Sequence, residues 1–183
     1  MNLEDYRKWL KKYGNYEEAQ ADKVAELLIN FHAPDSGDYL CQLFPRKVIH
    51  FEGGRLEFDL VIHLSWTGDN GHTYDRLIGV EFKETDTRKV VMQAIARRDL
   101  VDYMYIATRS VWLSGEELLD VFYYNIGWVV WFDEGPAQLV LPSRQNQQSY
   151  RDYLRCILER EAERVIGKLK EKKEAKLTYF VEV

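Results

Sequence analysis

The residues best placed to do chemistry are Asp59, Glu81 and Lys83, which lie within or at the end of two apolar segments. Segments 56–64 and 77–82 are rich in Val, Ile, Leu and Phe, which is typical of strands buried in a sheet. A strand projects residues i and i+2 to the same face, so Glu81 and Lys83 point the same way. Buried charges are costly unless they pair or bind a metal ion. An acid on one strand, beside an acid and a lysine on its neighbour, therefore indicates a functional site.

The spacing of these residues resembles a known signature. Asp59, a gap of 21 residues and Glu81-Phe82-Lys83 look like the motif of the PD-(D/E)XK nuclease superfamily. That superfamily includes restriction endonucleases, archaeal Holliday-junction resolvases and RecB-type exonucleases. The resemblance covers the motif and the order of elements from about residue 16 to residue 142, although Phe58 replaces the proline of the motif. It implies a restriction endonuclease-like αβββαβ core and metal-dependent DNA cleavage, by an endonuclease or an exonuclease.

The expected chemistry is hydrolysis of phosphodiester bonds with Mg²⁺ or Mn²⁺. Hard divalent cations prefer oxygen ligands, and Asp59 and Glu81 would supply two carboxylates. By resemblance to the family, the backbone carbonyl of Phe82 is a further ligand. Lys83 would orient or help deprotonate the attacking water and offset charge that develops on the phosphate.

Two more residues are candidates for the catalytic set, Glu17 and Gln93. Helical spacing over 16–31 predicts a buried stripe, and projecting it backwards places Glu17 on the same side. In the resembling family a glutamate of the first helix often reaches the metal site, so Glu17 is the first candidate and Glu18 the second. The alternative is an exposed acid that favours the helix dipole.

Gln93 lies on the helix expected at 88–101, where RecB-type sequences carry a glutamine. We expect it to support the site or to contact DNA, and the alternative is an exposed helix position. The same helix carries Arg88, Lys89, Arg97 and Arg98, which make it a candidate phosphate-facing surface or simply a solvated basic helix.

The hydrophobic pattern predicts an α/β domain with a mixed central sheet flanked by helices. We expect a nuclease-like core over 1–145 and a long C-terminal helix within 146–183, packed on the same domain or at a homodimer interface. The expected helices are 3–13, 16–31, 88–101 and 114–120, and the expected strands are 47–51, 56–64, 77–82, 103–108, 125–132 and 138–141.

Composition narrows the function classes. The chain has 183 residues, of which 46% are hydrophobic and 14% aromatic, so a folded domain is expected. The net charge of −5 argues against nonspecific coating of nucleic acid, but not against a locally basic contact surface. The two cysteines have no metal-ligand spacing around them. The sequence also has no apolar run of membrane-spanning length and no apolar signal-peptide core. We therefore expect a reduced, cytoplasmic protein.

Rival chemistries have little support in the sequence. The four histidines show no metal spacing, although His63 stands four residues after Asp59 and so either faces the site or is a partly buried strand residue. No nucleophile elbow and no P-loop are present, and a lysine two residues after the second acid fits a glycosidase poorly. The remaining alternative is an inert nuclease-fold module that binds nucleic acid or assembles with other proteins.

Overall fold

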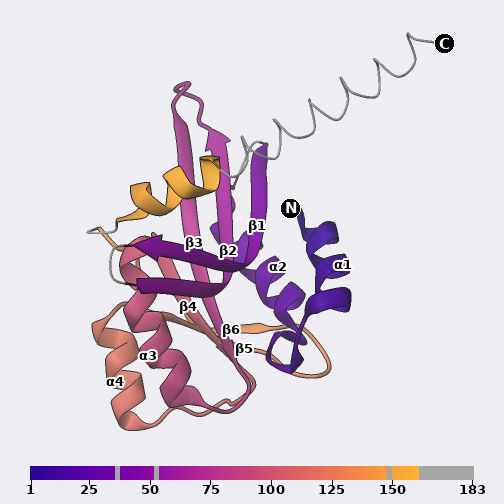
Figure 1. Cartoon of the computed structure of the whole chain (residues 1–183), viewed down its shortest axis with the longest axis vertical. Helices are drawn as coiled ribbons and strands as arrows, with labels where there is room; N and C mark the ends of the chain where they lie inside the picture. The colour runs from indigo at the N-terminus through magenta and orange to yellow at the C-terminus, as the bar shows by residue number, and fades with distance from the viewer. Residues whose placement is uncertain (36–37, 52–53, 148–149, 161–183) are drawn as a thin grey trace, which may run out of the picture.

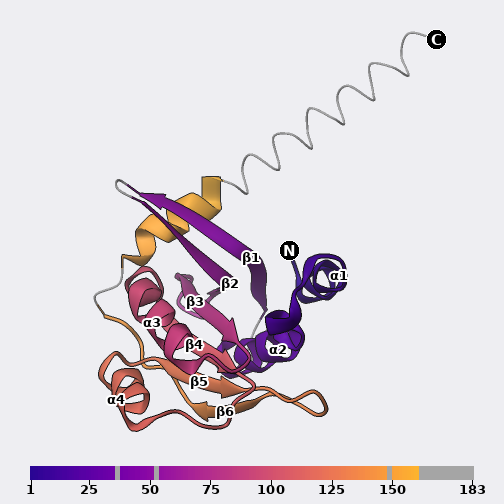
Figure 2. The same ribbon diagram turned by 60° about the horizontal axis from the view of Figure 1, so that its bottom comes forward.

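The computed structural model describes residues 1–35, 38–51, 54–147 and 150–160, and its elements form three layers. Figure 1 shows one sheet with α1 and α2 on one face and α3 and α4 on the other, and Figure 2 shows the same layers from another side. The elements are α1 (Leu3–Tyr13), η1 (Tyr16–Glu18), α2 (Ala21–His32), β1 (Tyr39–Phe51), β2 (Gly54–Thr67), β3 (Thr73–Lys83), α3 (Thr87–Arg97), η2 (Arg98–Leu100), β4 (Tyr103–Thr108), α4 (Gly115–Tyr123), β5 (Gly127–Val130) and β6 (Gln138–Leu141).

The sheet has six strands in the order β1-β2-β3-β4-β5-β6. The first three form antiparallel pairs, β3, β4 and β5 are parallel, and β6 returns antiparallel to β5. The α3 and α4 helices make the crossovers that parallel pairing requires. The predicted mixed α/β fold, with helices, three strands, a helix and a strand in that order, is confirmed. The carboxyl ends of β3, β4 and β5 meet at one edge of the sheet.

Each face of the sheet carries its own apolar core. On one face, α1 and α2 pack with buried residues that include Tyr6, Val24 and Leu28. On the other, α3 and α4 pack through Val90, Val91, Ala94 and Val121. Both faces of the central strands are therefore buried from solvent, which explains their nearly continuous apolar sequences.

The strands β1 and β2 bend together, and Asp59 lies at the bend. Figure 1 shows the hairpin end of both strands turning away from the rest of the sheet. In β1 the bend lies at Arg46, whose φ of 47° is a left-handed conformation. Pro45 precedes it without disturbing the sheet, because β1 is an edge strand. The ladder between β2 and β3 begins only at Leu60 and Val80, so β2 leaves β3 at Asp59.

Several predicted boundaries are wrong. The helix expected over 16–31 is divided into η1 and α2, and Phe31, expected on its buried stripe, is half-exposed. The strand expected at 47–51 begins at Tyr39, and it continues through Pro45 because an edge strand tolerates a proline. The strand expected at 125–132 spans only Gly127–Val130, since Asn125 has a φ of 56° that does not fit a strand.

The C-terminal helix is described only in its first part. Residues 151–160 are helical and lie against the sheet on the side of α3, with Leu154 and Leu158 buried in that core. The rest of the helix predicted within 146–183 lies outside the described residues. No helix in the described ranges is both long and apolar enough to cross a membrane.

Candidate active site

Asp59, Glu81 and Lys83 meet where β2 separates from β3. Leu60 and Val80 are the first paired residues of the two strands, and Asp59 and Glu81 are the next residue on each. Instead of a main-chain bond at this point, the amide of Phe82 donates to Asp59 Oδ2 over 2.7 Å. Phe82 packs into the core beneath α1 and α2, so strand alternation puts Glu81 and Lys83 on the α3 face. The bend therefore brings the Asp59 carboxylate beside the Glu81-Phe82-Lys83 segment.

Glu81 is a buried carboxylate without a well-formed hydrogen bond. Its side chain is 0% exposed, and neither of its carboxylate oxygens has a donor in good geometry among the described residues. Arg97 Nε lies 3.1 Å from Glu81 Oε1, but its N–H donates to the Glu57 carbonyl over 2.7 Å. Glu81 therefore forms an ion pair with Arg97, while the Asp59 main-chain amide favours its charged form without good hydrogen-bond geometry. Buried polar oxygens are nearly always satisfied, so this carboxylate is arranged for something other than stability.

The pKa values of Glu81 and Asp59 are both raised in the folded protein. Burial raises the pKa of Glu81 well above its usual value, and repulsion from Asp59 raises it further, against the opposing effects of Arg97, the Asp59 main-chain amide and Lys83. Burial also raises the pKa of Asp59, although the Phe82 amide and Lys83 favour its charged form. Two carboxylates that each resist ionisation in the free protein would both gain from a cation between them.

Among the described residues, Lys83 pairs with the carboxylate of Glu17. The two side chains form an ion pair in which Lys83 Nζ donates to Glu17 Oε2, and the lysine is nearly buried while the glutamate is 40% exposed. The acid comes from η1 and not from an α-helix, and its contact is with Lys83, while its expected role at the metal stays a prediction. This contact fixes the end of the Lys83 side chain at the edge of the sheet.

Glu18, the second candidate acid, points elsewhere. It is buried, and both carboxylate oxygens accept from the Arg46 guanidinium, at 3.3 Å and 2.7 Å. Its carboxylate also accepts a hydrogen bond from the main-chain amide of Asn15, which completes a capping box at the start of η1. Glu18 therefore fastens η1 to the bend of β1, and its charge also raises the pKa of Asp59, while Glu17 is the acid that pairs with Lys83.

Gln93 and Arg97 lie one helical turn apart on α3. Gln93 Oε1 is buried and accepts no hydrogen bond from a described residue. Arg97 is 12% exposed, and it also donates to the Gln93 carbonyl over 2.8 Å. Arg97 is therefore not part of an exposed basic surface on α3, whereas Arg88 and Lys89 are exposed and phosphate contact by them stays a prediction. The role of Arg97 as the counter-ion of Glu81 was not predicted. Arg97 is seven residues after Val90, and this spacing indicates that it lies on the same, buried face of α3.

The donor set fits a hard divalent cation. Glu81 offers two carboxylate oxygens, and Asp59 has one oxygen outside its bond to Phe82. These are the ligand atoms that Mg²⁺ and Mn²⁺ prefer. Within the described residues no three His, Cys, Asp or Glu side chains are grouped as a metal site. The residues therefore fit a cation held by two carboxylates, with water or substrate oxygens filling the other positions.

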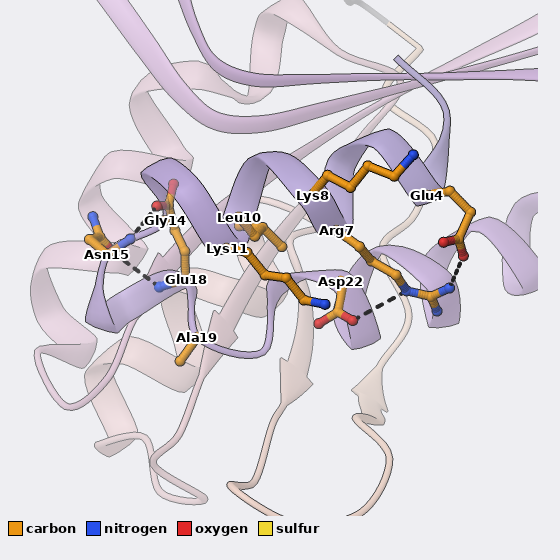
Figure 3. Close-up of a pocket in the computed structure, with 10 residues that line it drawn as sticks. All are labelled: Glu4, Arg7, Lys8, Leu10, Lys11, Gly14, Asn15, Glu18, Ala19 and Asp22. Atoms are coloured by element: carbon orange, nitrogen blue, oxygen red, sulfur yellow. Dashed lines mark hydrogen bonds and ion pairs between the residues drawn. The ribbon is translucent and has the colours of Figure 1, made fainter.

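A groove of about 510 Å³ between α1 and the start of α2 is a separate feature (Figure 3). Arg7 lies along it and pairs with Glu4, Asp22 and Glu26. Glu18 borders it but uses its carboxylate on Arg46. Arg7 and its three acidic partners therefore join α1 to α2 along this groove.

His63 does not face the site. Its Nε2 lies 3.5 Å from Asp75 Oδ2, and Arg155 Nε lies 3.7 Å from the same oxygen. Asp102 accepts from the Leu77 amide at 2.9 Å and from Arg151 at 3.0 Å. These polar groups connect β2 and β3 to the helical residues 151–160, so His63 belongs to the attachment of that helix.

Comparison with known proteins adds little to this description. No protein-family profile and no curated protein matches the sequence. The solved structure of the SPO1766 protein of unknown function from Silicibacter pomeroyi is similar with a TM-score of 0.42 and 15% sequence identity. The similarity covers 73% of this chain and 82% of that chain. A TM-score this low carries no argument, so the function has to be argued from the site.

Proposed function

We propose that the protein is a Mg²⁺- or Mn²⁺-dependent nuclease that hydrolyses phosphodiester bonds of DNA. The observation that carries the proposal is the Glu81 carboxylate, buried without a well-formed hydrogen bond beside Asp59. A fold gains nothing from such a group on its own, because removing an ion from water is costly. A bound cation would repay that cost.

In this proposal Asp59 and Glu81 hold the ion, and Gln93 is a further oxygen donor beside them. When bound, the ion acidifies a coordinated water and neutralises a phosphate oxygen. Lys83 donates from Nζ to the attacking water or to a nonbridging oxygen, which orients the nucleophile and offsets developing charge. Glu17 holds the lysine through its ion pair and leaves it able to exchange partners at the open edge. Arg97 favours the ionised form of Glu81 by its positive charge.

A second candidate is the inert nuclease-fold module, which one observation favours. Lys83 pairs with Glu17 and Arg97 pairs with Glu81, so the charges of the site are partly balanced without any ligand. In an inert module these pairs would simply connect β3 to η1 and α3. Such a protein would bind nucleic acid or other proteins without cleaving either.

Cleavage of a mixed DNA panel tests the two candidates against each other. Purified protein is incubated with linear duplex, single-stranded and four-way-junction DNA in Mg²⁺, in Mn²⁺ and in EDTA. We expect cleavage that needs the metal and that falls by roughly 100-fold or more in Asp59→Ala and Lys83→Ala, because each removes a group that acts in the reaction.

Lys8→Ala is the matched control, because Lys8 is an exposed lysine of α1, outside the candidate site, and its substitution removes the same charge. Full activity of Lys83→Ala, or equal losses in Lys83→Ala and Lys8→Ala, would overturn the assignment of the site. No cleavage of any DNA by the wild-type protein under these conditions would favour the inert module.

A further inference from the structure

Two exposed aromatic side chains flank the candidate active site, Tyr16 and Trp112. Tyr16 begins η1 and is 65% exposed, while Trp112 lies in the loop between β4 and α4 and is 76% exposed. Large aromatic side chains bury roughly 150–250 Å² each when they find a partner. Two such rings left in water at one edge of the sheet need an explanation.

Tyr16 and Trp112 are both connected to residues around the end of β3, Tyr16 through its side chain and Trp112 through its main chain. Tyr16 precedes Glu17, the partner of Lys83, and its hydroxyl accepts from Arg109 Nη1 over 3.3 Å. The same Arg109 nitrogen pairs with Glu84, the residue after Lys83. Tyr16 is therefore held next to the candidate site by its neighbour Glu17 and by the bond from Arg109 to its hydroxyl.

Trp112 is held by its main chain and not by its ring. Its amide donates to Ser110 Oγ over 3.2 Å, and Ser110 Oγ donates to the Trp112 carbonyl over 3.1 Å. The Ser110 amide in turn donates to the Glu84 carbonyl over 3.2 Å. The loop is therefore anchored to the end of β3, while the indole ring stays in solvent.

We infer that Tyr16 and Trp112 are stacking positions for unpaired bases, so that the substrate presents a single-stranded segment to the site. This inference rests on the proposed nuclease function and names the substrate class for it. Bases stack on aromatic rings in any sequence, because every base has a π-face. In a duplex the bases are already stacked on one another, so exposed rings at the mouth of the site favour a strand whose bases are free.

The charges around the rings agree with binding through bases. The two terminal nitrogens of Arg109 are engaged by Glu84 and Asp133, so the guanidinium has little left to offer a phosphate. Glu17 adds a further acid at the same edge. The aromatic rings therefore supply contacts to bases at a position where Arg109 has little to offer a phosphate.

Intrinsic fluorescence tests the inference without any cleavage. An oligothymidylate of about 16 nucleotides, the upper end of the usual site size for single strands, and a duplex of equal length are titrated into the full-length protein in EDTA. The chain has five tryptophans, and Trp112 is the most exposed of them, since Trp9 and Trp66 are partly buried and Trp128 and Trp131 are buried. We expect the single strand to bind more tightly than the duplex and to quench the signal.

The variants Trp112→Ala and Tyr16→Ala should each weaken binding roughly 10-fold or more, and Trp112→Ala should remove most of the quenching. Tyr123→Ala is the matched control, because Tyr123 is 81% exposed but ends α4, which leads away to the amino end of β5. The affinity of this control should equal that of the wild type.

Equal binding by Trp112→Ala and the wild type, or tighter binding of the duplex, would overturn the inference. A change of oligomeric state in Trp112→Ala at unchanged affinity would also overturn it, since the ring would then be a subunit contact. The proposed function is tested separately. If the protein cleaves DNA but binding does not depend on Trp112, only the proposed stacking positions are refuted. If binding depends on Trp112 but no metal-dependent cleavage occurs, the stacking positions are supported and the proposed nuclease activity is refuted.

Discussion

Replacing Asp59 by Asn should make the metal-free protein more stable and remove its response to metal. Burial raises the pKa of Asp59, so its ionised carboxylate is less favourable in the folded protein than in water. The side-chain oxygen of the new asparagine can still accept from the Phe82 amide, which now donates to Asp59 Oδ2 over 2.7 Å. The substitution therefore removes a charge that opposes ionisation of Glu81 while it keeps the local hydrogen bond.

The expected gain is about 1 kcal/mol, the usual scale when a strained functional group is relieved. For a domain of this size that raises Tm by roughly 2–4 °C in EDTA at a pH of about 8. The substitution is expected to stabilise the protein for the following reason. A carboxyl group whose pKa is higher in the folded protein than in the unfolded chain lowers the free energy of unfolding only at pH values where it is ionised. The gain should shrink as the pH falls through the raised pKa and vanish below about 3.8, the ordinary value for Asp.

Metal should act differently on the two proteins. At a metal concentration of about 100 Kd the wild type gains roughly 2.7 kcal/mol, or about 5–10 °C in Tm. Asp59→Asn should gain much less at the same concentration. Scanning calorimetry in EDTA, Mg²⁺ and Mn²⁺ measures both effects, with Asp69→Asn in the exposed β2–β3 turn as the control. A lower Tm of Asp59→Asn in EDTA, or an equal gain from metal in both proteins, would refute the reasoning.

Three further substitutions test the fold around the site. Burial lowers the pKa of His32 from 6.5 to about 4, and its Nε2 lies 2.8 Å from the Tyr105 hydroxyl. The wild type should thus lose about 3 kcal/mol as the pH falls between these two values, and urea unfolding of His32→Gln should show a smaller loss. Gly127→Ala should cost about 3 kcal/mol by urea unfolding, because its Cβ would come within 2.2 Å of the Tyr105 ring; a cost near zero would contradict the tight packing. Leu154→Ala should cost about 3 kcal/mol if residues 151–160 belong to the cooperative core, and an unchanged Tm would show that they do not.

The strands and the acidic site could be predicted because their signals are local. Segments 56–64 and 77–82 are apolar over most of their length, as strands buried on both faces are. A charge within such a segment is conspicuous, which is why the sequence alone singles out Asp59, Glu81 and Lys83. Their meeting at one point follows from the antiparallel pairing of adjacent strands.

The partners of these residues depend on long-range geometry and were harder to predict. Glu17 reaches Lys83 because η1 is a separate 3-10 turn capped by Asn15, which a helical projection over 16–31 does not describe. A basic residue on a helix usually lies at the surface, but Arg97 lies on the buried side of α3. The bend at Arg46 depends on a positive φ that no pattern of hydrophobic residues indicates.

Titration of Mn²⁺ into the metal-free protein tests whether Asp59 and Glu81 hold one divalent cation. Electron paramagnetic resonance of free Mn²⁺ counts the ions that the protein takes up. We expect one site in the wild type that is lost in Glu81→Gln and kept in Glu116→Gln, which alters an exposed acid of α4. Equal uptake by the two variants, or none by the wild type, would contradict it.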